Sequence, residues 1–242
     1  MSEIVKAIPL TNLSLSFLPV LVVLIAMWRW GLAYRNAVYG LFRMLLQLFL
    51  VGYVLAFIFL SESSWIIMAV LAVMLVAASW IALREAGMTA DTRLVMRSLL
   101  SICLGGVPVL FLVTQGVLGM EPWYSPRYMI PLAGMIFANS MNSVSLAAER
   151  LRSEMGHGVE YGKARVTALQ ASLIPVINSL FAVGLVSLPG MMTGQILSGV
   201  EPVIAARYQI MVMCMIFGSA GISAMLFLVF INPDANRSDV SP

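Results

Sequence analysis

The sequence predicts an all-α, polytopic integral membrane protein with about seven transmembrane helices. Of its 242 residues, 61% are hydrophobic and only 10% are charged, and the mean hydropathy is +0.96. A membrane-spanning helix needs about 20 mostly apolar residues, and the chain holds a series of apolar runs of that length separated by short polar segments. Seven such helices use most of the chain, so we expect a single transmembrane domain over residues 1–242.

The apolar runs define the expected spans. These are Leu13–Met27, Val38–Leu60, Trp65–Leu83, Leu99–Leu118, Met129–Ala147, Ala168–Leu188 and Tyr208–Ile231. Only Lys6 precedes the first run as a basic residue, and no small-residue cleavage site closes it. We therefore expect a retained helix there and not a secretory signal.

Basic residues lie mainly in alternate loops. The loops after the first, third and fifth spans hold Arg29, Arg35, Arg84, Arg93, Arg97, Arg150, Arg152, Lys163 and Arg165. The other loops hold only Arg127 and Arg207. Because Lys and Arg are retained on the cytoplasmic side, the amino terminus is expected outside and the carboxyl terminus inside.

Two spans carry polar residues on one helix face. In the second span, Arg43 and Gln47 are four residues apart, and either Arg43 extends to the membrane surface or both side chains make an internal polar contact. In the fifth span, Asn139, Asn142 and Ser143 share a face. They either form hydrogen bonds between helices or line a transport pathway.

The methionines raise the question of a soft metal site. The last third of the chain contains Met191, Met192, Met211, Met213 and Met215. Thioethers prefer ions such as copper(I), but methionine also fills irregular helix interfaces. No His or Cys accompanies these residues at ligand spacing, which favours packing.

The segment Gly184–Pro202 interrupts the apolar pattern with four glycines and two prolines. Pro189 and Gly190 can end one helix, and Gly190 with Gly194 forms a G-x-x-x-G pair that permits close helix approach. We expect the sixth span to end near Leu188, followed by a short helix or re-entrant turn on the outer side. This segment, with Met191 and Met192, is an outer gate, a subunit contact or a packing joint.

The longest charged segment is Ala148–Ala168, between the fifth and sixth spans. Its charged residues are Glu149, Arg150, Arg152, Glu154, Glu160, Lys163 and Arg165. Arg150 and Glu154 have the spacing of an ion pair on a short helix, and we expect Gly156, Gly158 and Gly162 to break the chain after it. The segment is either an ordinary solvated loop or a docking element for a cytoplasmic partner.

The sequence has no phosphate-binding loop, because its one Gly-Lys pair, Gly162-Lys163, is followed by Ala164 and lacks the upstream glycine. Nucleotide chemistry would therefore need another chain. All eleven acidic residues fall in loops, tails or helix ends, which disfavours an ion-coupled carrier. No nucleophile, acid pair or metal cluster suggests an enzyme.

Three blocks of the sequence resemble the FetB-type permeases of ATP-binding-cassette exporters, which are linked to iron export and related to plant aluminium-tolerance proteins. The best block is VGLVSLPGMMTGQILSGVEP with AARYQIMVM, residues 183–202 and 205–213. The second block consists of Arg43, Gln47 and Val51-Gly52-Tyr53. The third block runs from Ile130-Pro131 through Ile136, together with Asn139. Met155-Gly156-His157-Gly158 and Phe181 stand where the family typically has a Leu-Gly-Ala turn and a lysine.

The resemblance implies an exporter permease in the bacterial cytoplasmic membrane that works by alternating access. It implies no cofactor in this chain, with ATP-Mg bound to a separate ATPase subunit that docks near residues 148–168. It also implies two permeases and two ATPases in the assembly, iron or another metal ion as cargo, and no nucleic acid. The alternative is a stand-alone channel or secondary carrier without an ATPase.

Overall fold

The computed structural model describes residues 8–58, 63–85, 88 and 91–232. Most of these residues lie in helices, and no strand is present among them apart from one isolated bridge between Val183 and Ser187. The predicted all-helical class is thus confirmed. Contacts divide the chain into two compact units, Met1–Ser61 and Glu62–Pro242, and a single domain over the whole chain stays a prediction.

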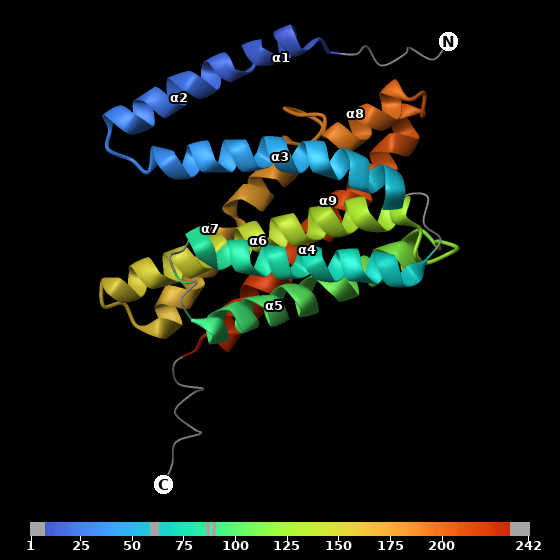
Figure 1. The fold of residues 1–242 in the computed structure, drawn as a ribbon. Helices are drawn as coiled ribbons and strands as arrows, with labels where there is room; N and C mark the ends of the chain where they lie inside the picture. The colour runs from blue at the N-terminus through green and yellow to red at the C-terminus, as the bar shows by residue number, and fades with distance from the viewer. Residues whose placement is uncertain (1–7, 59–62, 86–87, 89–90, 233–242) are drawn as a thin grey trace. The chain divides into compact units, whose positions relative to one another are not determined.

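The first unit contains α1 (Leu10–Leu15), α2 (Phe17–Arg29) and α3 (Tyr34–Ile58). α2 packs against α3 after a turn in which Gly31 has a φ of +70°, a left-handed conformation that favours glycine. Figure 1 shows these helices in blue. No residue of α2 is buried, which suits a helix whose apolar side chains face lipid.

The second unit holds the remaining elements. They are α4 (Ser64–Glu85), α5 (Thr92–Phe111), the π-helix η1 (Leu112–Val117), α6 (Pro126–Gly156), α7 (Tyr161–Ala182), α8 (Gly190–Leu197) and α9 (Pro202–Phe230). α9 packs against α5, α6 and α7, while α4 packs against α5 and α6, and the short α8 packs on α9 (Figure 1). The core includes the fully buried side chains of Ile102, Ile136 and Phe227.

Small residues bring the core helices close together. A Cβ placed on Gly105 of α5 would lie 2.7 Å from the backbone nitrogen of Ser223 on α9. A Cβ on Gly106 would lie 2.8 Å from Cγ2 of Ile136 on α6. Close backbone approach through small residues is a common way of packing helices in membranes, where the hydrophobic effect cannot drive their association.

Six helical segments are long and apolar enough to span a membrane. They are Leu10–Arg29, Tyr34–Val54, Ser64–Arg84, Thr92–Val117, Tyr161–Ala182 and Pro202–Phe230. The remaining long helix, α6, covers the predicted fifth span with 31 residues, but it is the least apolar of the long helices. A seventh crossing by α6 stays a prediction, as does the orientation of the chain in the membrane.

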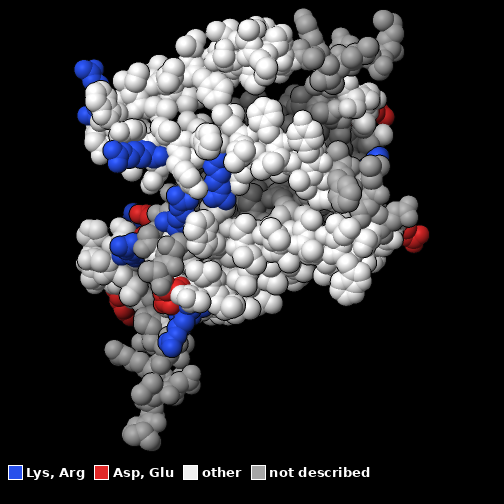
Figure 2. All heavy atoms as spheres, viewed as in Figure 1, with Lys and Arg blue, Asp and Glu red and all other residues white. Residues whose placement is uncertain are grey.

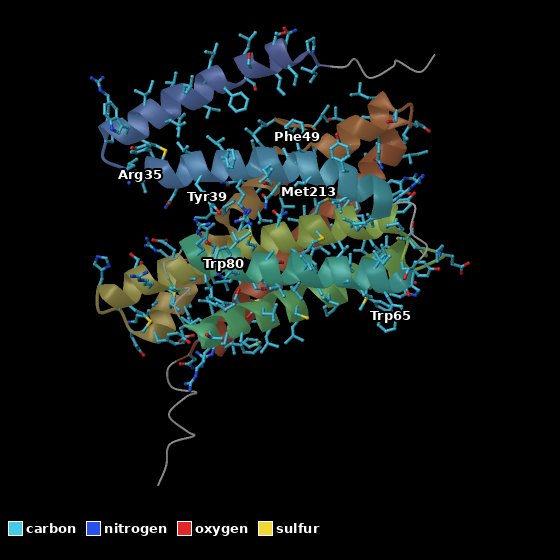
Figure 3. The ribbon with its side chains drawn as sticks, viewed as in Figure 1. Arg35, Tyr39, Phe49, Trp65, Trp80 and Met213 are labelled. Carbon is cyan, nitrogen blue, oxygen red and sulfur yellow. The ribbon has the colours of Figure 1, made fainter. Side chains whose placement is uncertain are left out.

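The ends of the second unit differ in charge. Arginines and lysines at the end of α4, the start of α5, the end of α6 and the start of α7 gather at one end, while Arg127 and Arg207 begin α6 and α9 at the other. Figure 2 shows few charges on the flank of the helices between these ends. Trp65 and Trp80, labelled in Figure 3, lie toward opposite ends of α4, as aromatic residues at two membrane surfaces would.

The structure differs from the predictions at both ends of α7. The sixth span ends at Ala182 and not near Leu188, because Gly184 takes a φ of +82° and its N–H donates to the Ser187 carbonyl at 3.0 Å, which turns the chain early. In the charged segment, α6 continues through Gly156 and Gly162 lies inside α7. Only the turn His157–Glu160 separates the two helices, and Gly158 there has a φ of +79°.

Candidate substrate cavity

A cavity of about 410 Å³ lies among α6, α7, α8 and α9 of the second unit. It has room for on the order of ten water molecules at about 30 Å³ each. It also falls within the size range of pockets that hold small ligands, about 300–1,000 Å³. The cavity is therefore the candidate substrate site.

The structure brings together predicted residues from two separate parts of the sequence. Asn139, Asn142 and Ser143 of α6 line the cavity, and so do Pro189, Gly190 and Met191 at the start of α8. The polar face predicted for α6 results from its i, i+3 and i+4 spacing, which places all three side chains on the same side of the helix.

The broken segment supplies the other wall. After α7 ends at Ala182, the chain turns back and Pro189 caps the start of α8 with extended backbone. Pro202 then lies in the first turn of α9, as predicted for the return to the last span. The predicted short helix between residues 184 and 202 is thus confirmed, while its placement relative to a membrane stays a prediction.

The polar face of α6 makes a hydrogen bond between helices, one of the two roles that the sequence left open, while a role in lining a transport pathway stays a prediction. Ser143 Oγ donates to the Ser172 carbonyl at 3.3 Å, a hydrogen bond between α6 and α7. Asn139 Nδ2 donates to the Met135 carbonyl of its own helix at 2.8 Å. That bond leaves Asn139 Oδ1 as the acceptor that this side chain can offer to a ligand.

Gln209 is a cavity residue that the sequence analysis missed. It lies on α9, lines the cavity and is only 5% exposed. Its Oε1 atom is buried, and no described residue provides it with a hydrogen-bond partner. A buried acceptor left unpaired costs about 1–3 kcal/mol, so the site favours a ligand that brings a donor or a positive charge. The signal was a lone amide inside an otherwise apolar span.

Four more residues line the cavity without having been predicted to do so, although Met213 belongs to the methionine group considered above as a possible soft metal site. Met135, Ser172, Ser179 and Met213 line the same space. Met135 precedes Asn139 by four residues on α6, and Met213 follows Gln209 by four on α9, so each helix presents one thioether and one amide.

The cavity wall is electrically neutral. None of the described residues that line it is ionisable. The side chains that line it carry amide and hydroxyl oxygens and thioether sulfurs, which can replace the hydration of a cation without forming an ion pair.

Two further predicted residues, Met192 and Gly194, do not line this cavity. Met192 lines a neighbouring, mostly apolar hollow of about 350 Å³ that also touches Gln209 and Met213. A Cβ on Gly190 or Gly194 would meet no heavy atom within 4 Å among the described residues, so the expected close helix approach is not found among them. A role for Gly194 in subunit contact stays a prediction.

Arg43 and Gln47 belong to α3 of the first unit. With the amide of Gln47 turned so that its oxygen faces Arg43, that oxygen accepts from Nε at 3.0 Å and from Nη2 at 3.3 Å. The arginine is half-buried. Arg43 thus has a polar partner on its own helix, and its extension to the membrane surface and its part in a pathway both stay predictions.

The charged end of the second unit is a helical hairpin. Arg150 Nη2 contacts Glu154 Oε1 at 2.6 Å, which confirms the predicted ion pair, though on a continuous α6. The Tyr161 hydroxyl at the start of α7 donates to the Leu228 carbonyl near the end of α9. Beneath it, six residues of α6, α7 and α9 form a buried cluster: Ala147, Leu151, Ala164, Ala168, Ala224 and Leu228. The three helices are therefore tied together at this end.

Comparison with known proteins places the chain in a family. The uncharacterised protein family UPF0014 matches residues 10–161 and 159–234, which is most of the sequence. The chain belongs to UPF0014. Its membrane character, predicted from composition, agrees with the names of its UPF0014 relatives.

Three UPF0014 relatives illustrate the range of the similarity. A UPF0014 membrane protein of Synechocystis is 40% identical over 72% of this chain and 73% of its own length. The Arabidopsis thaliana protein ALUMINUM SENSITIVE 3 is 36% identical over 78% of this chain and 72% of its own. The probable iron export permease protein FetB of Escherichia coli is 32% identical over 79% of this chain and 78% of its own length. No solved structure matches this UPF0014 chain.

Proposed function

We propose that this UPF0014 protein is the permease subunit of an ATP-binding-cassette exporter that moves iron or another metal ion out of the cytoplasm across the bacterial cytoplasmic membrane. The observation that carries the proposal is the cavity with the buried, unpaired Gln209 Oε1 in a chain similar to a probable iron export permease. A cavity of this kind is what a transported cation needs within a membrane.

The physical task is to lower the cost of leaving water. Moving a small ion into a medium of low dielectric constant costs on the order of 20 kcal/mol in an idealised estimate. Oxygen and sulfur atoms of the cavity wall can replace part of the lost hydration. Gly190 and Met191 at the start of α8 line the cavity, and we propose α8 as its gate.

The energy source is a separate ATPase subunit. This chain has no phosphate-binding loop, and the α6–α7 hairpin carries the charged residues proposed to dock the partner that binds ATP-Mg: Glu149, Arg150, Arg152, Glu154, Glu160, Lys163 and Arg165. Two permeases and two ATPases would form the working assembly.

The hairpin offers a route from the ATPase to the cavity. The Tyr161–Leu228 hydrogen bond and the buried cluster of small residues beneath it tie α6 and α7 to α9. These three helices also line the cavity, so a displacement at the turn His157–Glu160 moves cavity walls. ATP can shift the inward and outward states only by binding one of them more tightly.

The test is transport in vesicles. The chain is reconstituted with its candidate ATPase so that the ATPase faces outward, and ATP-dependent accumulation of radiolabelled iron and competing metals is measured. We expect accumulation that requires ATP and falls when Gln209 is changed to leucine, while Met211→Leu, outside the cavity, leaves it unchanged. Absence of nucleotide-dependent transport of any tested metal overturns the proposal.

The same flux measurement, made on liposomes without the ATPase, addresses the alternative of a channel or secondary carrier. Liposomes with this chain alone should show no metal flux beyond that of empty liposomes. Flux without the ATPase, abolished by Gln209→Leu, would favour the alternative.

A further inference from the structure

Resting on the proposed function, the geometry points to a cargo class: we propose that the cavity binds a soft, monovalent metal cation of the copper(I) type through the thioether sulfurs of Met135, Met191 and Met213, beside Gln209 Oε1. These sulfurs come from three helices, α6, α8 and α9, and meet at one cavity. Figure 3 labels Met213 on α9.

The exposure of these methionines separates them from packing residues. Met135, Met191 and Met213 are half-buried and line open space. Met215 on α9 is 2% exposed and Met129 on α6 is 6% exposed, as expected of methionines that fill a helix interface. The three cavity methionines therefore lie where a ligand in the cavity can contact their side chains.

The lack of charged side chains on the described cavity wall favours a cation of low charge. None of the described lining residues is ionisable, so no side chain of the described wall neutralises the charge of a bound cation. The cost of transferring an ion from water rises with the square of its charge, which makes a divalent ion roughly four times as costly as a monovalent ion of equal size. A neutral wall thus favours a monovalent cation over a hard divalent one.

The thioether side chains of the cavity favour a soft metal ion. Thioether sulfurs prefer copper(I) and similar ions, whereas magnesium, calcium and manganese prefer carboxylate, carbonyl and water oxygens. Among the described residues, no group of three or more His, Cys, Asp or Glu side chains is placed to hold a metal. The unpaired Gln209 Oε1, in the same cavity, gains a partner when a cation binds.

The test uses silver(I), which is stable in air, on the full chain purified in detergent. Cys103 and Cys214 are changed to alanine first, because a free thiol binds silver by itself. Titration calorimetry measures affinity, and X-ray absorption at the silver edge counts sulfur neighbours. We expect one tight site per chain with two to three sulfur neighbours.

Variants decide which sulfurs are involved. Met213→Leu and Met191→Leu should each weaken silver binding at least tenfold, and the double variant should abolish the tight site. Met211→Leu, on the same helix but outside the cavity, is the matched control and should stay within twofold. Gln209→Glu adds a negative charge to the wall and should raise the affinity for manganese(II) at least tenfold.

The outcomes separate this inference from the proposed function. No tight silver site, or a site that survives the double methionine variant, overturns the cargo assignment even if ATP-dependent iron transport is observed. A thioether site whose loss leaves every ATP-dependent flux unchanged also overturns it. A thioether site in a chain that transports no metal with any ATPase supports the binding assignment and contradicts the exporter.

Discussion

Replacing Gly105 by alanine tests how closely α5 and α9 approach. The added Cβ would lie 2.7 Å from the backbone nitrogen of Ser223 and 2.9 Å from its Cα. Ordinary contact begins at 3.4 Å, so the backbone is too close by about 0.5–0.7 Å. A rotamer change at Ser223 cannot relieve a contact with its backbone, and the two helices must separate.

The expected magnitude is the difference between two effects. Overpacking a core costs about 1–3 kcal/mol, while Gly→Ala within a helix gains about 0.8–1 kcal/mol of propensity. We expect Gly105→Ala to lower the free energy of unfolding by up to about 2 kcal/mol, and by about 1–3 kcal/mol relative to a Gly→Ala change that gains the propensity without the overpacking. The effect reaches the candidate site, because α9 carries Gln209 and Met213.

Gly218→Ala is the matched control on α9, since a Cβ there meets nothing within 4 Å among the described atoms. It should leave stability unchanged or raise it by up to about 1 kcal/mol. Denaturant titration in mild detergent, followed by tryptophan fluorescence, measures both variants. If their unfolding free energies agree within about 0.5 kcal/mol, the close approach of α5 and α9 is wrong.

Three further changes address other contacts. Tyr161→Phe removes the hydrogen bond to the Leu228 carbonyl and should cost about 1–2 kcal/mol of unfolding free energy while lowering transport per ATP hydrolysed. Ser98→Ala removes a buried hydrogen bond of 3.2 Å to the Ser79 carbonyl between α5 and α4, and should cost about 0.6–2 kcal/mol in denaturant titration. Arg150→Ala breaks an exposed ion pair and should change stability by less than about 1 kcal/mol, with a larger effect on ATPase co-purification.

For each of these three substitutions, one result would contradict the expected outcome. Equal transport per ATP in Tyr161→Phe would show that the hydrogen bond to α9 carries no coupling. A Ser98→Ala variant as stable as the parent would mean that the bond contributes nothing net. If Arg150→Ala lowers the free energy of unfolding by more than about 2 kcal/mol, the ion pair acts in folding. If this variant binds the ATPase as well as the parent does, docking lies elsewhere. Lys6→Ala is the control, because Lys6 lies outside the hairpin in the sequence.

Helix positions were largely predictable because they depend on local patterns. The apolar run predicted the start of the last span six residues after the first residue of α9, Pro202, whereas the proline itself correctly marked the return of the chain. The end of α7 was missed, since proline at residue 189 was a stronger visible signal than Gly184, whose left-handed backbone actually turns the chain. Several consecutive residues allowed a turn, and the sequence did not distinguish among them.

The hairpin shows a second kind of error. Three glycines between residues 156 and 162 suggested a broken loop, yet only Gly158 takes a left-handed conformation. The buried alanines below the turn and the Tyr161 hydroxyl bond stabilise the flanking helix ends, and tertiary contacts of this kind outweigh the modest helix cost of a glycine.

By itself, the sequence determined the membrane class, the helical spans, the polar face of α6 and the break before α9, because each depends on residues that are near neighbours along the chain. Only the tertiary structure decided that Gln209 and Met213 of α9 line one cavity with Met135 and Asn139 of α6 and Met191 of α8. That arrangement depends on which faces of four helices meet, and this follows from close packing at small residues such as Gly105, whose partner on α9 lies far away in sequence.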